Sequence, residues 1–307
     1  MEFGRVDIKE LDKIDLSLPP DPASNKKILK GKPAKDPKVY VGCAKWGRQE
    51  WVGKIYPKGT REAKFLDHYV KHYNSIELNA MHHKLYGPIA TAKWATKARG
   101  EDFLFCPKMY KGITHSGKLG EKKFFMTDFI RAIKGFGKNL GPVFVQVNES
   151  FSPKRKDELL KFLETLPEDV QFFMEVRHPA WFAKKENLKE LFDLLKKLNI
   201  GAVITDTAGR RDCLHMQLTT PTAFVRFTGN SLHATDYTRI DDWVKRIKIW
   251  LDNGLKELYY FMHMHDEATS PELTVYLVDK MNKECGLNLI KPKFISEQKD
   301  RQASLFD

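Results

Sequence analysis

Eight short apolar runs recur along the chain, and most of them end at a charged or hydrogen-bonding residue. They begin near Val39, Ser75, Phe103, Pro142, Gln171, Ala202, Ala223 and Leu258. A strand that is buried on both faces of a sheet has such a nearly continuous apolar sequence. The pattern therefore predicts eight buried strands, with polar side chains gathered at their carboxyl ends.

Amphipathic or capped segments separate the apolar runs and predict helices between the strands. The expected helices cover residues 61–73, 88–99, 152–166, 184–199, 238–254 and 271–286, whereas residues 210–218 have room for only a short helix. This alternation predicts an α/β fold, the (β/α)8 or TIM barrel. An open doubly wound sheet is the alternative, because a sequence does not establish closure.

The alternation spans residues 39–287, which we interpret as one TIM-barrel domain. Residues 1–38 are rich in Lys, Asp and Pro, and we expect this N-terminal extension to pack under the barrel. Residues 288–307 form a short, polar C-terminal tail.

The composition is that of a globular protein, because 42% of the residues are hydrophobic. No apolar stretch approaches the roughly 18 residues of a membrane-spanning helix, so we expect no membrane partner. Four widely spaced cysteines without a CxxC motif and a polar N-terminus favour a reducing, cytoplasmic location. The sequence lacks the GxGxxG and P-loop fingerprints, and no cofactor is predicted.

The net charge of +12 favours an anionic partner. Part of the excess lies between Lys108 and Lys138, where eight Lys/Arg stand against two Asp/Glu. Phosphate binding is one interpretation of this segment, and a solvated helix face is the other.

Several motifs in order carry a family resemblance: GCAKW at 42–46, W..KIYP at 51–57, NSIELNAMHHKLY at 74–86, F.FCPKMYKGITH at 103–115, LGPVFVQV at 140–147, EVRHPAW at 175–181, AFVRFTG at 223–229 and YYF at 259–261. Together they resemble the DUF72 (YecE-like) family. The resemblance implies a TIM barrel and no established biochemical function. The chain departs from the family pattern at Ala44-Lys45, at Thr228-Gly229 and after Phe261.

The fifth and second predicted strands each end in a polar pair on one face. Because side chains alternate along a strand, Glu175 and Arg177 share one face of the fifth strand, and His178 lies on the opposite face. Glu77 and Asn79 likewise share one face of the second strand. Buried charges are costly unless they are paired. One interpretation is that Arg177 holds an anionic substrate while Glu175 acts as acid or base. The other is a structural ion pair.

Lys108 ends the third strand and is a candidate phosphate contact, or a base if it is desolvated. His115 follows in a glycine-containing loop that can present donors to a phosphate, or that is an ordinary loop. Gln146 ends the fourth strand, and Trp46 follows the first, where its ring can stack on a base or sugar or simply cover the barrel.

Three further strand-end residues are candidates. Asp206 is a possible second carboxylate or a helix cap, and Arg226 needs a carboxylate partner, for which Glu175 and Asp206 are candidates. His263 is a possible acid/base group or polar filling. A divalent-metal site is a minority alternative, with Glu77, Glu175, Asp206 and a histidine as its ligands. No local ligand spacing supports this site, and no metal is predicted.

The tail ends in QASLF at 302–306, which resembles the short peptides that bind the bacterial sliding clamp. Gln302 would supply polar contacts, while Leu305 and Phe306 would enter an apolar pocket. The alternatives are that these side chains pack on the barrel or that the match is accidental.

These features favour a hydrolase that acts on a phosphate-bearing substrate, with DNA as a candidate substrate and the sliding clamp as a candidate partner. Glu175, Glu77, Asp206 and His263 are the candidate catalytic residues. A non-catalytic adaptor for nucleic acid or a metabolite, and a sugar or sugar-phosphate enzyme, remain the alternatives.

Overall fold

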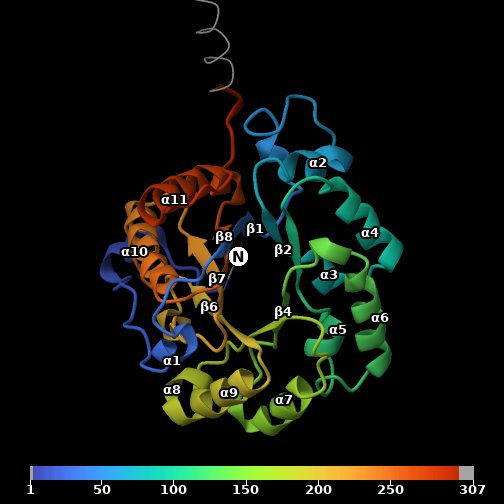
Figure 1. The fold of residues 1–307 in the computed structure, drawn as a ribbon, viewed down its shortest axis with the longest axis vertical. Helices are drawn as coiled ribbons and strands as arrows, with labels where there is room; N and C mark the ends of the chain where they lie inside the picture. The colour runs from blue at the N-terminus through green and yellow to red at the C-terminus, as the bar shows by residue number, and fades with distance from the viewer. Residues whose placement is uncertain (1–2, 297–307) are drawn as a thin grey trace, which may run out of the picture.

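The computed structural model describes residues 3–296, in which a ring of helices surrounds eight strands (Figure 1). The strands are β1 (Lys38–Cys43), β2 (Ser75–Leu78), β3 (Leu104–Pro107), β4 (Val143–Gln146), β5 (Phe172–Glu175), β6 (Gly201–Asp206), β7 (Thr222–Gly229) and β8 (Glu257–Met264). Each of them begins within a residue of its predicted start.

All strand pairs are parallel, in the order β3-β2-β1-β8-β7-β6-β5-β4. The outer strands β3 and β4 meet through isolated bridges instead of a regular ladder. Gly141 N donates to Phe105 O at 2.8 Å, and Met109 N donates to Phe144 O at 2.8 Å. These contacts close the sheet, and the predicted TIM barrel is confirmed.

Most of the predicted helices are present. The described helices are α1 (Asn25–Leu29), α2 (Phe65–Tyr69), α3 (Ala80–His83), α4 (Pro88–Lys97), α5 (Lys111–Thr114), α6 (Lys123–Lys134), α7 (Lys156–Leu163), α8 (Ala180–Ala183), α9 (Lys185–Lys197), α10 (Ala234–Asp252) and α11 (Ser270–Cys285). The helix predicted over 61–73 shrinks to a 3-10 turn and α2. In contrast, α10 begins four residues early, because the His233 side chain caps it by accepting from Thr235 N.

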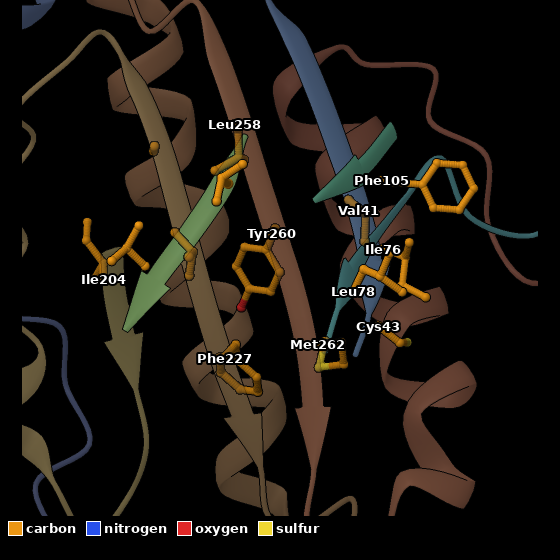
Figure 2. Close-up of a cluster of buried hydrophobic side chains, with 14 of the residues drawn as sticks. Val41, Cys43, Ile76, Leu78, Phe105, Ile204, Phe227, Leu258, Tyr260 and Met262 are labelled. Carbon is orange, nitrogen blue, oxygen red and sulfur yellow. The ribbon is translucent and has the colours of Figure 1, made fainter. Parts of the chain in front are cut away.

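Strand alternation separates two apolar regions. The barrel interior holds a mainly aromatic cluster of Tyr40, Cys106, Phe144, Phe173, Val203, Phe224, Tyr259 and Phe261. The intervening strand residues face outward into the larger core under the helices, as Figure 2 shows for Val41, Leu258, Tyr260 and Met262. Inward-facing residues beyond the aromatic floor therefore line the mouth of the barrel.

The N-terminal extension runs along the side of the barrel from the mouth to the base. Residues 3–4 contact Thr207, just after β6, whereas Gly31 N donates to Asn253 O near the start of β8. Between these ends, Arg211 donates to the carbonyls of Leu16 and Ser17. The extension thus packs on the short β6–β7 connection, where the structure has only a 3-10 turn (Arg211–Cys213). Our expectation that the extension packs under the barrel was wrong except for its last part.

The described part of the C-terminal tail packs along the helical layer. Lys293 N donates to His72 Nδ1 at 3.2 Å, and Ile295 N donates to Lys54 O at 3.0 Å. The clamp-like peptide at 302–306, with Gln302, Leu305 and Phe306, lies outside the described residues. Within residues 3–296, the search for a helix long and apolar enough to cross a membrane finds none.

Candidate functional site

A buried arginine between two carboxylates forms the centre of the mouth. Arg226 of β7 grips Glu77 of β2 with two donors, from Nε to Oε2 at 2.7 Å and from Nη2 to Oε1 at 2.9 Å. Its Nη1 lies 3.3 Å from Oε2 of Glu175 on β5. The partner that the sequence required for Arg226 is therefore Glu77 together with Glu175, and not Asp206. We call Glu77, Glu175 and Arg226 the inner cluster.

The two carboxylates have further donors. Thr205 donates its hydroxyl to Glu175 at 2.5 Å, and Arg177 Nε donates to the same oxygen at 3.1 Å. Asn79 Nδ2 donates to Glu77 Oε1 at 2.9 Å, and His263 Nε2 lies 3.1 Å from Glu77 Oε2. The predicted pairing of Glu175 with Arg177, and of Glu77 with Asn79, thus occurs inside the barrel.

These partners keep both carboxylates ionised. Burial acts to raise the pKa of Glu77, but Arg226 and His263 outweigh it and lower that pKa well below its usual range. Burial also acts to raise the pKa of Glu175, but Arg177 and Arg226 outweigh it and lower that pKa. A carboxylate that is saturated by arginines is a weak proton acceptor, so the inner cluster is suited to positioning charge.

The aromatic floor supports the cations of the mouth. The Phe144 ring lies 4.6 Å from the guanidinium carbon of Arg226 and 5.4 Å from Nζ of Lys108. Both cations come from inward-facing positions directly above the interior cluster. A ring face attracts a cation more strongly where water is excluded, so these contacts help to hold both side chains at the mouth.

Lys108 is the cation that lacks a strong counter-charge. Its Nζ donates to the neutral Gln146 amide oxygen at 2.9 Å, and among residues 3–296 it forms no ion pair within 4 Å. Burial, followed by repulsion from Arg226 and Arg177, lowers the pKa of Lys108 to about 8. The surroundings therefore favour an anion beside this ammonium group.

Two histidines next to Lys108 are neutral near pH 7. The rings of His82 and His115 lie 4.8 Å apart, and Thr114 Oγ1 lies 2.7 Å from His115 Nδ1. Burial and then Lys108 lower the pKa of His115 to about 4 and that of His82 to about 3. His82 Nδ1 also lies 2.7 Å from the Met109 carbonyl oxygen, so this histidine has a backbone partner.

Asp206 belongs to a different cluster outside the barrel. Strand parity turns Thr205 inward and Asp206 outward, where its carboxylate contacts Arg239 of α10 at 2.8 Å, Arg211, and Trp243 Nε1 at 2.7 Å. Burial raises the pKa of Asp206, but Arg239 and Arg211 lower it overall. We call Asp206, Arg211 and Arg239 the outer cluster.

Two other candidates also lie apart from the inner cluster. His178 Nδ1 accepts from Ala180 N at 3.1 Å at the start of α8. Trp46 is half-buried and packs edge-on against Trp94 of α4, with ring centroids 5.4 Å apart. These contacts support local structural roles.

The metal alternative required Glu77, Glu175, Asp206 and a histidine to converge. Asp206 faces outward, and Arg226 occupies the space between the two glutamates. Among residues 3–296 no group of three or more His, Cys, Asp or Glu side chains is arranged to hold a metal ion.

Sequence reasoning missed three residues at the mouth. Thr205 binds Glu175, Glu149 Oε1 lies 3.2 Å from Arg177 Nη1, and the Phe3 ring lies 4.1 Å from the Arg177 guanidinium carbon. The parity of β6 shows that Thr205 and Asp206 face opposite sides of the sheet, but not which of the two faces the barrel interior. Nothing local in the sequence indicates that Phe3 reaches the mouth.

A family model described as "Protein of unknown function DUF72" matches residues 40–296. The UPF0759 protein YecE of Escherichia coli K12 is 26% identical over 263 residues, which cover 80% of this chain and 93% of that protein. The UPF0759 protein YunF of Bacillus subtilis is 26% identical over 47% of this chain and 52% of that protein.

Solved structures agree with the fold. A DUF72 family protein from Enterococcus faecalis has a TM-score of 0.63 at 16% identity, over 83% of this chain and all of that one. A DUF72 family protein from Thermotoga maritima has a TM-score of 0.58 at 22% identity, over 81% of this chain and all of that one. At these identities the likeness establishes the barrel and nothing finer.

Proposed function

The chain belongs to the DUF72 family, whose function is unknown, and from this premise we propose that its barrel mouth binds the phosphate of an anionic substrate. Lys108 carries the proposal, because its half-buried ammonium group is repelled by Arg226 and Arg177 and its described hydrogen-bond partner is a neutral amide. A phosphate there would relieve the repulsion that lowers the pKa of Lys108. Phosphate binding by such preorganised cations is common.

We further propose that the protein hydrolyses a phosphoester. Water would attack the phosphorus and form the new P–O bond while the ester P–O bond breaks. The Lys108 ammonium, whose proton is acidified by burial and by two arginines, would donate that proton to the departing alkoxide, and the proton lost by the water would pass to the phosphate product. Arg177 would stabilise the charge that develops on the phosphoryl oxygens. Glu175 and Glu77 would hold the two arginines in place, since both carboxylates are saturated by donors. Because Glu175 is saturated by donors, this proposal assigns proton transfer to Lys108 instead of Glu175.

The binding step is tested by calorimetry with inorganic phosphate. We expect Lys108→Met to weaken phosphate binding at least about tenfold, because a charge-assisted hydrogen bond is lost. The matched control is Lys123→Met, an exposed lysine of the same basic segment, which leaves the affinity unchanged. The proposal would be overturned if the wild-type protein does not bind phosphate, or if Lys108→Met binds phosphate as tightly as the wild type does.

The chemical step needs a substrate panel. Nitrophenyl phosphates, nicked DNA and abasic DNA are incubated with the protein, with and without divalent metal. Turnover that disappears in Lys108→Met supports hydrolysis. Phosphate binding without any turnover supports the alternative of a non-catalytic adaptor, which the locked state of Glu77 and Glu175 favours.

Recruitment to DNA through residues 302–306 is a separate proposal that rests on their sequence. A synthetic peptide of residues 296–307 is titrated against a bacterial sliding clamp. We expect weak, saturable binding that is lost when Leu305 and Phe306 are replaced by Ala. No binding at millimolar peptide would end this proposal.

A further inference from the structure

A hollow lies at the mouth, between residues 5–8 and the residues that follow β7 and β8. Its volume is about 630 Å³. The polar residues that line it are Arg5, Asp7, Asn230, Ser231 and His265. Such a volume is within the range of small-molecule sites. We call this hollow the rim pocket and residues 3–8 the mouth segment.

The mouth segment is fixed to the barrel by a close backbone contact. Gly209 N donates to Gly4 O at 2.8 Å, and the Thr207 hydroxyl donates to the same oxygen at 3.1 Å. Gly4 has a φ of +70°, and a β-carbon there would lie 2.4 Å from Thr207. Glycine is therefore required at this position both for its conformation and for space.

Phe3 connects the mouth segment to the inner cluster. Its ring is 8% exposed and covers the guanidinium groups of Arg177 at 4.1 Å and Arg210 at 5.0 Å. The segment that forms one wall of the rim pocket thus also rests on an arginine that contacts Glu175. The family model begins at residue 40, so this wall comes from outside the part of the chain that the family model matches.

Asn230 lines the opposite wall of the rim pocket and contains a buried acceptor. The residue is 2% exposed, and its backbone N–H and side-chain amide N–H both donate to Asp236. Its Oδ1 has no hydrogen-bond partner in the described part of the chain. A buried acceptor without a donor is costly, so this atom favours a ligand that brings an O–H or N–H group.

The other groups of the rim pocket narrow the class of ligand. Arg5 and Asp7 provide one charge of each sign, and Val6 and Ile8 add apolar surface. Alternating hydroxyl and C–H faces, as in a sugar ring, suit such a lining better than a second phosphate. His265 of the rim pocket lies two residues after His263, which contacts Glu77 of the inner cluster.

We propose that the rim pocket binds the sugar portion of a phosphorylated sugar, with the mouth segment as one wall of the site. The inference rests on the proposed function for the phosphate portion, which Lys108 would hold. The sugar hydroxyls would donate to Asn230 Oδ1. Binding of both portions would make the ligand tighter than inorganic phosphate alone.

Calorimetry on the full chain compares inorganic phosphate with ribose 5-phosphate and glucose 6-phosphate. We expect one or both sugar phosphates to bind about tenfold more tightly than inorganic phosphate, because a buried acceptor gains its donor. Gly4→Ala displaces the mouth segment together with Phe3, which covers Arg177, so the readout is the ratio of sugar-phosphate to inorganic-phosphate affinity in the same variant. We expect this ratio to fall to about one. Gly209→Ala repeats the test from the barrel side, since its β-carbon would lie 2.9 Å from Gly4 O.

Gly31→Ala is the matched control. Gly31 also lies in the extension with positive φ, but a β-carbon there meets nothing within 4 Å. We expect this variant to keep the sugar-phosphate advantage. Its retention separates displacement of the mouth segment from general strain in the extension.

The outcomes distinguish failure of the rim-pocket inference from failure of the proposed phosphate binding. Sugar phosphates that bind no better than inorganic phosphate, or an advantage that survives both Gly4→Ala and Gly209→Ala, would overturn the rim-pocket inference and leave phosphate binding intact. Free ribose or glucose that binds in a Gly4-dependent way, without phosphate binding, would support the rim pocket and overturn the proposed function. No binding of any probe would overturn both.

Discussion

The inner and outer clusters lie at the same end of the barrel and are made of the same groups, yet they differ in what surrounds them. Glu77, Glu175 and Arg226 point into the mouth, whereas Asp206 with its arginines points into the layer between the sheet and α10. One step in strand parity, from Thr205 to Asp206, separates the two environments.

The difference lies in how completely the charges are matched. The outer carboxylate is closed off by two arginines and the Trp243 indole. The inner cluster adjoins Lys108, whose pKa is lowered because burial and two arginines oppose its charge. A buried carboxylate–arginine pair is therefore no sign of function by itself. The unmatched cation beside it is the informative feature.

Removing the central arginine has the largest expected effect. Arg226→Met leaves Glu77 and Glu175 buried without their shared cation, and we expect the free energy of unfolding to fall by about 3–5 kcal/mol. Urea denaturation measures the change. Arg131→Met, on the exposed surface of α6, is the control and is expected to change stability by less than about 0.5 kcal/mol. A loss below about 1 kcal/mol in Arg226→Met would mean that the inner cluster is not the tightly coupled unit described.

Acid is expected to weaken both clusters together. The folded-state pKa values of Glu77, Glu175 and Asp206 are lowered, so their stabilisation is present above the unfolded-state values of about 4 and is lost as pH falls below them. We expect a loss of about 2–3 kcal/mol between pH 5 and pH 3, measured by urea denaturation at each pH. In Arg226→Met this decline should be shallower, because the arginine that lowers the pKa of Glu77 and Glu175 is gone. An equal slope in both proteins would assign the acid sensitivity to the outer cluster.

The sequence predicts the inner cluster better than the outer one, for physical reasons. Runs that are apolar on both faces identify all eight strands, and parity within one strand correctly pairs Glu175 with Arg177. Parity does not say which of the two faces is the barrel interior when both faces are buried. Asp206 therefore was a reasonable candidate partner for Arg226 until the register of β6 against β7 was known.

Contacts between distant segments escape this reasoning altogether. Phe3 and Arg177 are far apart in sequence, and no periodicity links a polar extension to a strand end. Only the packing of the extension on the short β6–β7 connection brings the mouth segment to the barrel. The same holds for the lowered pKa of Lys108, which depends on Arg226 and Arg177 from other strands.

Two substitutions that each remove one hydrogen bond compare the clusters with a smaller loss of stability. Thr205→Val removes a donor from Glu175, and Trp243→Phe removes one from Asp206. We expect each to lower the free energy of unfolding by about 1–2 kcal/mol in urea denaturation. Only Thr205→Val should also change phosphate affinity, because Glu175 positions Arg177. A change in phosphate affinity of the same size in Trp243→Phe would remove the functional distinction between the clusters.

Lys108 has the smallest expected effect on stability, and this makes it the sharpest test of the comparison. A folded-state pKa of about 8 lies below the ordinary value of 10.5, so the unfolded chain binds more protons between these values. This group therefore makes the protein more stable as pH rises from 8 to 10.5. We expect Lys108→Met to leave the free energy of unfolding at pH 7 unchanged or to raise it by about 1 kcal/mol, and to flatten this alkaline rise in urea denaturation. A structural ion-pair residue would behave in the opposite way, as Arg226 is expected to. Loss of stability in Lys108→Met would mean that the ammonium already has its counter-charge in the fold, and the main argument for an anion at the mouth would be removed.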